Sequence, residues 1–366
     1  MILGVEKNLW PAFLMGVLAI FLSTPTVQAQ TVKDLPPPPP LWKAKPTPTP
    51  KPPEQEVLDV VRVTSNLVMV PVSVTNEQGN AVQGLQIADF RLDEEGKQQE
   101  ITEMGNPEQV PLEIALLIDV SGSTNTRFEF EKMAAARFLR EVLKKDDRAS
   151  LFIIDRTPVL KQVSTTADVA ASSLLGFSPA VDKGPTAFYD TVVEASRYLE
   201  KTPARHRRVV VVVSDGADNF SEIIKKTIGT TTEEQLSASV AVKDRVNNRA
   251  LTEVERSLQR ADAVFYAINP AGNTMYLNVI TRRGHEGMQR LAESTGGNTF
   301  VPEADADLTN VFNRIAAELR GQYLLQYYAN ADAPRTQFRR IKVTVPARND
   351  VRVRARQGYY PKKQQD

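Results

Sequence analysis

The middle of the chain contains short runs of consecutive apolar residues that are separated by stretches with helical periodicity. One run extends from Ile114 to Ile118, and another consists of five valines from Val209 to Val213. A strand needs such an unbroken run when helices cover both faces of its parallel sheet. The helical stretches supply the crossover connections. We therefore expect an α/β domain at residues 110–320, with a doubly wound, mostly parallel sheet and helices on both faces.

The same periodicities predict the other elements of this domain. The predicted strands and helices are as follows: strands at 151–154 and 263–268; helices at 127–143, 167–175, 288–292 and 308–319; and one more helix that Thr186 opens. The residues predicted to form the apolar face of the first helix are Phe130, Met133, Ala134, Phe138 and Val142. Gly296 and Gly297 predict a helix end before a further strand.

Both flanks of the α/β domain show the period-two pattern of half-buried β strands. Valines occupy every second position from Val68 to Val74, and turn residues follow at 76–80 and 93–96. Further strands are expected at 323–328, 341–345 and 351–354. Pro71 lacks an N–H donor, so its strand is expected at a sheet edge or at a bulge. We predict that residues 57–106 and 321–358 form one small antiparallel β domain, followed by a tail at 359–366.

The N-terminal 29 residues have the features of a signal peptide. An apolar run follows Lys7, and Val27-Gln28-Ala29 forms a small-x-small cleavage site. An uncleaved anchor is the alternative, although the apolar run is too short to span a bilayer. Residues 30–56 hold ten of the 24 prolines and predict an extended linker. The chain contains no cysteine, which excludes disulfides and lipoprotein acylation. We expect an exported protein that is periplasmic, on the cell surface or secreted, without an integral membrane span after cleavage.

Polar residues follow two of the predicted strands, at the edge where open α/β sheets bind ligands. The candidate metal ligands are Asp119, Ser121 and Ser123 after the first apolar run, Thr186 at a helix start, and Asp215 after the second run. Each alone has an ordinary explanation as a helix cap or a turn. Together they offer only oxygen donors, which suit a hard cation. We therefore expect a divalent cation, Mg²⁺ first, with Mn²⁺ or Ca²⁺ as alternatives.

The same five residues, in this order and at these elements, resemble the metal-ion-dependent adhesion site of von Willebrand factor type A (VWFA) domains. The resemblance covers residues 112–320, and the flanks resemble an exported bacterial subfamily of VWFA-related proteins. It implies that the hydroxyls of Ser121 and Ser123 bind the cation directly, and that Thr186 does so directly or through water. It also implies that Asp119 and Asp215 act largely through bound waters. An Asp or Glu carboxylate of a protein or peptide partner would complete the coordination.

These features predict a binding or adhesion module that is not an enzyme and has no catalytic residues. A phosphatase of the haloacid-dehalogenase type would need an aspartate in place of Ser121, and Ser121 also lacks the Gly-x-Ser-x-Gly frame of serine hydrolases. The two histidines, His206 and His285, are expected to be solvated, with His285 at a helix start. A metal-independent scaffold of an envelope or secretion assembly is the main alternative, and a hydrolase is the lesser one.

Two further points concern partners. A formal net charge of +1 gives no support for binding to nucleic acid. The polar stretch at 220–245 is longer than an average connection and leaves from the expected metal edge, so we expect it to form part of the rim that selects the partner. The sequence leaves the oligomeric state open.

Overall fold

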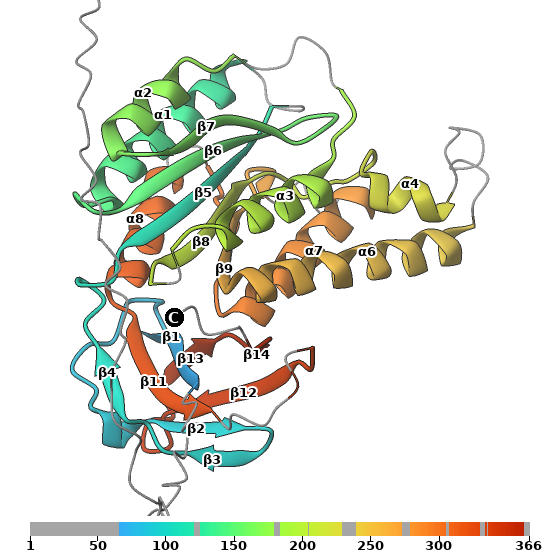
Figure 1. Cartoon of the computed structure of the whole chain (residues 1–366). Coiled ribbons are helices and arrows are strands. Elements are labelled where there is room, and N and C mark those ends of the chain that lie inside the picture. Colours follow the sequence, from blue (N-terminus) through green and yellow to red (C-terminus); the bar gives the residue numbers. More distant parts are fainter. Residues whose placement is uncertain are drawn as a thin grey trace, which may run out of the picture. The chain divides into compact units, whose positions relative to one another are not determined.

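The computed structural model of the protein describes residues 66–120, 125–178, 184–203, 205–228, 239–272, 279–304, 307–329, 334 and 336–361 (Figure 1). These residues belong to one compact unit, Arg62–Asp366. The expected signal peptide and proline-rich linker lie outside the described residues, as do Ser121 and Ser123. Among the described residues, no helix combines the length and the apolar character needed to cross a membrane.

A six-stranded sheet forms the centre of the α/β domain, with the strand order β10-β9-β8-β5-β6-β7. The bounds are β5 Leu112–Asp119, β6 Arg148–Ile154, β7 Val159–Thr165, β8 Arg207–Val213, β9 Ala263–Ile268 and β10 Thr299–Phe300. All neighbouring strands are parallel except β7, which runs antiparallel to β6 at one edge. The unbroken apolar runs are buried in the middle of this sheet, as the sequence predicted.

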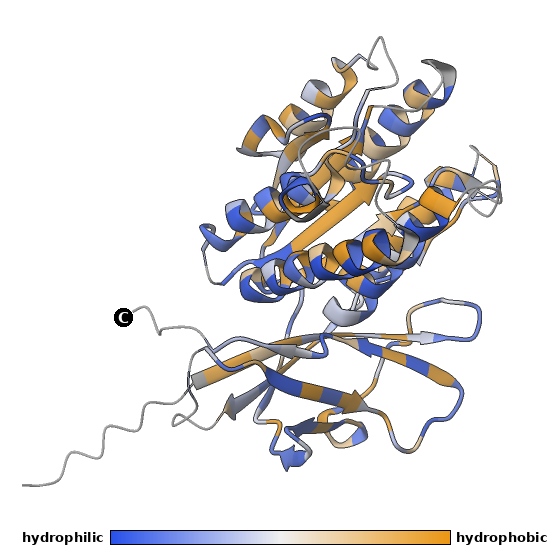
Figure 2. Cartoon of the chain, turned by 90° about the vertical axis from the view of Figure 1, so that its right-hand side faces the viewer, coloured by the Kyte–Doolittle hydropathy of each residue, from blue (hydrophilic) through white to orange (hydrophobic). Residues whose placement is uncertain are grey.

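Helices cover both faces of this sheet. The bounds are α1 Asn125–Val142, α2 Ala167–Leu175, α3 Phe188–Glu200, α4 Glu222–Ile228, α6 Val240–Ala261, α7 Val279–Thr295 and α8 Asp307–Arg320. One apolar core joins the sheet to α1, α2 and α8, and a second joins it to α3, α6 and α7. Figure 2 shows hydrophobic strands enclosed by helices that have hydrophilic outer faces. The prediction of a doubly wound α/β domain is confirmed.

The prediction for the apolar face of α1 was wrong at two positions. Phe130 is 50% exposed and Met133 is 63% exposed, whereas Phe128 and Leu139 are fully buried. Phe128 and Leu139 are separated by about three helical turns and therefore lie on one face. Phe130 lies two positions after Phe128, roughly 200° further around the helix, and faces solvent. Phe138 and Val142 are buried as predicted.

Two four-stranded antiparallel sheets form the β domain. Their orders are β13-β1-β11-β4 and β14-β12-β2-β3. The bounds are β1 Asn66–Asn76, β2 Arg91–Glu94, β3 Lys97–Gln99, β4 Glu103–Gly105, β11 Tyr323–Ala329, β12 Arg339–Thr344, β13 Val351–Ala355 and β14 Gly358–Tyr359, with a short 3₁₀ helix at Ile87–Asp89. Each sheet pairs strands from both flanks of the α/β domain, for example β1 with β11 and β2 with β12. The prediction of one β domain built from both flanks is confirmed.

Pro71 does not lie on an edge strand, contrary to prediction, because β1 has neighbours on both sides. Its pairing with β13 begins only at Val72, however, and Pro71 itself faces Leu324 of β11. At Pro71, β1 therefore has a paired strand on one side only, and the missing N–H removes no hydrogen bond to β13.

One buried charged side chain, Arg207, forms hydrogen bonds to both connections between the domains. Arg207, at the start of β8, donates from Nη1 to the carbonyl oxygen of Leu319 (2.6 Å) and from Nη2 to that of Pro107 (2.8 Å). Pro107 lies on the incoming connection, and Leu319 lies at the end of α8 just before the outgoing one. Burial lowers the pKa of Arg207 to about 10, which leaves the guanidinium charged at neutral pH.

Candidate functional site

Three of the five predicted ligands are described, and all three belong to the carboxyl edge of the parallel sheet. Asp119 is the last residue of β5, and Asp215 follows the end of β8 by two residues. The two strands are direct neighbours, with Ile118 opposite Val213. Thr186 lies two residues before α3. The structure therefore confirms that these residues lie at strand ends or at a helix start, as the sequence predicted.

A hydroxyl group connects the ends of β5 and β8. Ser214 Oγ donates to Asp119 Oδ2 at 2.7 Å and accepts from the backbone N–H of Gly216 at 3.0 Å. Asp215 Oδ1 accepts from the backbone N–H of Ala217 at 2.9 Å. Each carboxylate is thus oriented by a bond to the same short turn. The sequence analysis missed Ser214, although its position directly after the apolar run is a signal for this role.

The loop before α3 is joined to the loop after β8. The backbone N–H of Thr186 donates to Asn219 Oδ1 at 2.8 Å, while the N–H groups of Asn219 and Phe220 donate to the carbonyl oxygen of Thr186 at 3.2 and 3.1 Å. Thr186 is 5% exposed. The N-cap residue of α3 is Ala187, which forms no side-chain cap bond. The ordinary explanation of Thr186 as an N-cap therefore does not apply.

Asp218 organises the loop that contains Asp215, and the sequence analysis did not identify it. Its Oδ2 accepts from the backbone N–H of Tyr189 at 2.7 Å and from Ser221 Oγ at 2.5 Å. Its Oδ1 accepts from the N–H groups of Phe220 and Ser221 at 3.2 and 3.0 Å. Burial raises the pKa of Asp218 to about 6, while these hydrogen bonds act in the opposite direction. Asp218 thereby connects the first turn of α3 to the loop after β8.

Helix α7 supports this loop through a close contact between two backbones. Gly216 has φ +74°, which favours glycine, and a Cβ atom there would lie 2.7 Å from the carbonyl oxygen of Gly284. A Cβ atom at Gly284 would lie 2.6 Å from the carbonyl oxygen of Asp215. Only glycine at both positions allows α7 to approach so closely. A glycine inside a long helical pattern was the available sequence signal.

The described donors fit a hard divalent cation in their chemistry. Asp119, Asp215 and Thr186 supply carboxylate and hydroxyl oxygens, which Mg²⁺, Mn²⁺ and Ca²⁺ accept. Ser121 and Ser123 lie outside the described residues. Within the described ranges, no three His, Cys, Asp or Glu side chains are grouped to hold a metal. The predicted site has only two carboxylates, so three hydroxyls would complete its donor set.

Both histidines differ from the sequence prediction. His206 lies at the amino end of the sheet, with Nδ1 3.4 Å from Oε2 of the buried Glu113 at the start of β5. His285 lies inside α7 instead of beginning it, and burial lowers its pKa. His285 Nδ1 is buried without a described hydrogen-bond partner. Neither histidine is freely solvated.

The stretch at 220–245 also differs from the long polar loop that the sequence suggested. Residues Glu222–Ile228 form α4, and Val240 begins α6. Glu222 N–H donates to Asp190 Oδ2 at 2.7 Å, which attaches the start of α4 to α3. Residues 229–238 lie outside the described residues, so the predicted role of this stretch at the rim stays a prediction.

Comparisons with known proteins find similarity only among solved structures. No family model and no curated protein matches the chain. The PilB minor pilin from Streptococcus sanguinis is 13% identical, with a TM-score of 0.45, over 58% of this chain and 62% of the pilin. A von Willebrand factor type A protein from Catenulispora acidiphila is 12% identical (TM-score 0.40; 71% and 51% covered). The vWF domain of the type V pili tip protein Mfa5 from Porphyromonas gingivalis is also 12% identical (TM-score 0.42; 57% and 94% covered).

At these identities and scores, the similarities do not assign the chain to a family. The chain spans about three fifths of the pilin chain. The fold class rests on the strand order and the two helical layers of this structure.

Proposed function

We propose that the protein is an exported binding module that captures a partner's carboxylate through a divalent cation at the carboxyl edge of its α/β domain. The observation that carries this proposal is the joining of Asp119 to the turn of Asp215 through the Ser214 hydroxyl. The buried position of Thr186, which does not cap α3, supports it further. The five-residue pattern that resembles the VWFA adhesion site supplies the remaining ligands, Ser121 and Ser123.

The donor set explains why such a site would recognise an anionic oxygen. Hydroxyl ligands are neutral, so two carboxylates that act through water leave much of a divalent charge uncompensated. A bound Mg²⁺ would supply a strong Lewis-acidic point charge with an open coordination position. The protein's own residues do the orienting: Ser214 fixes Asp119, and the N–H of Ala217 fixes Asp215. This arrangement favours affinity for a carboxylate rather than catalysis.

Exposed apolar residues near this edge suit a protein partner. Val279 and Ile280 begin α7, and each is 51% exposed. The same helix contacts the Asp215 turn through Gly284. Apolar side chains beside a polar centre are typical of protein-binding surfaces. We propose a protein or peptide with an Asp or Glu side chain as the partner.

A cation-dependent melting experiment tests the metal site. The purified chain is heated in chelator and with added MgCl₂, MnCl₂ or CaCl₂. A cation at about 100 times its Kd is expected to add about 3 kcal/mol to the free energy of unfolding. Thr186→Ala, Asp215→Asn and Ser121→Ala are expected to remove this increase. Ser172→Ala, at an exposed position on α2, serves as the control and is expected to keep it.

Partner binding is tested by a pull-down from envelope extract with Mg²⁺ and with chelator, using the same variants. Binding that requires Mg²⁺ and is lost in Ser121→Ala supports carboxylate capture. A complex that forms equally well in chelator supports the alternative of a metal-independent scaffold. Turnover of an ester, peptide or phosphate substrate would contradict a non-enzymatic role.

A further inference from the structure

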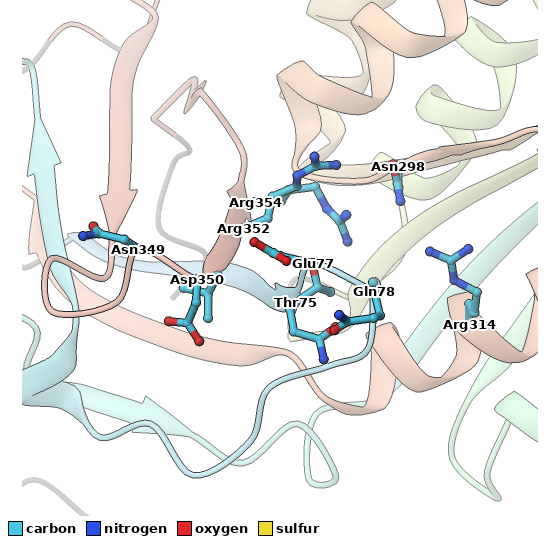
Figure 3. Close-up of a pocket in the computed structure, with 12 residues that line it drawn as sticks. Thr75, Glu77, Gln78, Asn298, Arg314, Asn349, Asp350, Arg352 and Arg354 are labelled. Atoms are coloured by element: carbon cyan, nitrogen blue, oxygen red, sulfur yellow. The ribbon is translucent and has the colours of Figure 1, made fainter.

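A polar cleft of about 280 Å³ lies where β1, β13 and α8 come together (Figure 3). Its lining includes Glu77, Asn298, Arg314, Arg352 and Arg354. It shares no residue with the candidate metal site. Because its walls carry more positive than negative side chains, the ligand that this cleft favours is an anion.

Three arginines occupy every second position from near the start of β13 to the residue after it, and two of them have carboxylate partners. Arg352 and Arg354 lie two residues apart on β13 and therefore face the same side of the strand, and Arg356 follows its last residue, Ala355. Arg354 Nη2 lies 2.6 Å from Oε2 of the buried Glu318 on α8. Arg356 forms an ion pair with Asp262 at the end of α6. Arg352 and Arg354 both line the cleft, and of the two it is Arg354 that forms an ion pair, with Glu318 of α8.

Arg314 of α8 lines the cleft from the α/β domain. Its guanidinium lies 5.1 Å from the ring centroid of Phe300. Across the described ranges, no carboxylate oxygen lies within the 4.0 Å ion-pair distance of Arg314 or Arg352. Two arginines thus line one cleft, from two different domains, and neither forms an ion pair with another described residue. Their positive charges favour an anion in the cleft.

The two acidic side chains of the cleft do not balance these charges. Asp350 is paired with Arg348, whose Nε lies 2.6 Å from Asp350 Oδ1. Glu77 is exposed and forms no ion pair with another described residue. Figure 3 shows Arg352, Arg354, Arg314 and Asn298 around the same pocket. Asn298 can add an N–H donor, since its Oδ1 already accepts from Thr299 N–H.

We propose that this cleft binds a compact oxyanion, a phosphate or carboxylate group, between Arg314 and Arg352. Guanidinium groups bind such oxyanions through paired N–H donors, which gives both charge and geometry. The volume is slightly below that of pockets for drug-sized ligands, so it suits a small molecule or a single anionic group. An anion bound by both arginines would join the β domain to α8.

Calorimetric titration of the full chain tests this proposal, in buffer without divalent cations and at constant ionic strength. The probes are inorganic phosphate, sulfate and citrate, with chloride as the background anion. Saturable binding of one anion per chain is expected, and the comparison of phosphate with citrate separates the two oxyanion types. Arg352→Gln and Arg314→Gln are each expected to weaken binding about tenfold or more. Arg249→Gln, at an exposed position on α6, is the matched control and should bind like the unchanged protein.

Arg314 and Arg352 are exposed, so these variants are expected to fold, which circular dichroism and melting curves would check. Glu77→Gln removes a negative side chain from the cleft and is expected to tighten binding. The proposal is overturned if none of the three anions binds saturably, or if both arginine variants bind as tightly as Arg249→Gln. Weaker binding by Glu77→Gln would also contradict an anion site.

Discussion

The two ends of the central sheet use charged side chains in different ways. At the amino end, Arg207 bonds to the connections on both sides of the domain, and Asp147 accepts from Leu112 N–H and Arg320 Nη2. At the carboxyl end, the side chains of Asp119 and Asp215 bond to the turn that follows β8. The amino end therefore joins domains, while the carboxyl end orients oxygen atoms. This comparison separates residues needed for stability from residues available for binding.

Arg207→Ala tests the amino end and is expected to have the largest effect. The substitution leaves the carbonyl oxygens of Leu319 and Pro107 without their buried donor and removes packed side-chain volume. We expect the free energy of unfolding to fall by about 4 kcal/mol. Because Arg207 bonds to both connections, calorimetry is expected to resolve separate transitions for the two domains. Chemical denaturation followed by circular dichroism measures the loss.

Arg205→Ala is the control for this substitution, since Arg205 is exposed and lies two residues away. It is expected to change stability by less than about 0.5 kcal/mol. If Arg207→Ala were equally neutral, the contrast between the two ends of the sheet would be wrong.

Gly284→Ala tests whether the carboxyl end is also held by packing. The added Cβ atom would lie 2.5 Å from the carbonyl carbon of Gly216, so α7 or the Asp215 turn must shift. We expect a loss of about 3 kcal/mol in stability, together with weaker cation binding, measured by denaturation and by melting with MgCl₂.

The same helix offers a matched control in Gly287. A Cβ atom there would meet its nearest neighbours, Leu251 and Tyr189, at 3.6 Å, which is ordinary van der Waals contact. Gly287→Ala is expected to stabilise the protein by up to about 1 kcal/mol through helix propensity. Equal effects of the two substitutions would show that the Gly216 contact does not restrain the loop.

The sequence predicted the fold wherever burial determined the pattern. The apolar runs of β5 and β8 could belong only to strands covered on both faces, and the alternating valines of β1 identified one buried face. The orientation of α1 was harder to predict, because apolar residues occur on more than one of its faces. Met133 and Phe128 are similar in hydrophobicity, and only the packing partners decide which of them is buried.

The sequence predicted the strand-end residues of the candidate site but not the residues that hold their loops in place. Asp119, Thr186 and Asp215 follow from strand ends and from a known pattern. Asp218 and Gly284 act through contacts with segments that are distant in sequence, Asp218 with α3 and Gly284 with the Asp215 turn. Such tertiary contacts leave only weak local signals, so sequence reasoning did not find either residue.

The pH dependence of stability tests the role of Asp218 at the carboxyl end and is expected to give a smaller effect than Arg207→Ala or Gly284→Ala. The folded pKa is about 6, above the ordinary value of 3.8, because of burial. Between these values the unfolded chain loses the proton first, so rising pH favours the unfolded state. In chelator, the contribution of Asp218 to stability is expected to fall by roughly 2 kcal/mol between about pH 4 and pH 7 and to stay constant above that.

Asp218→Asn separates this titration from the hydrogen bonds of Asp218. The amide has one acceptor oxygen in place of the two that accept four hydrogen bonds in Asp218, which lowers stability by an amount independent of pH. The difference in unfolding free energy between the original protein and the variant is therefore expected to shrink as pH rises from about 4 to 7. A difference that instead grows as pH rises toward about 4 and then stays constant would mean that the four hydrogen bonds outweigh burial and keep the pKa of Asp218 below its ordinary value. In that case Asp218 would be a permanent anion beside the candidate metal site and would add to its attraction for cations.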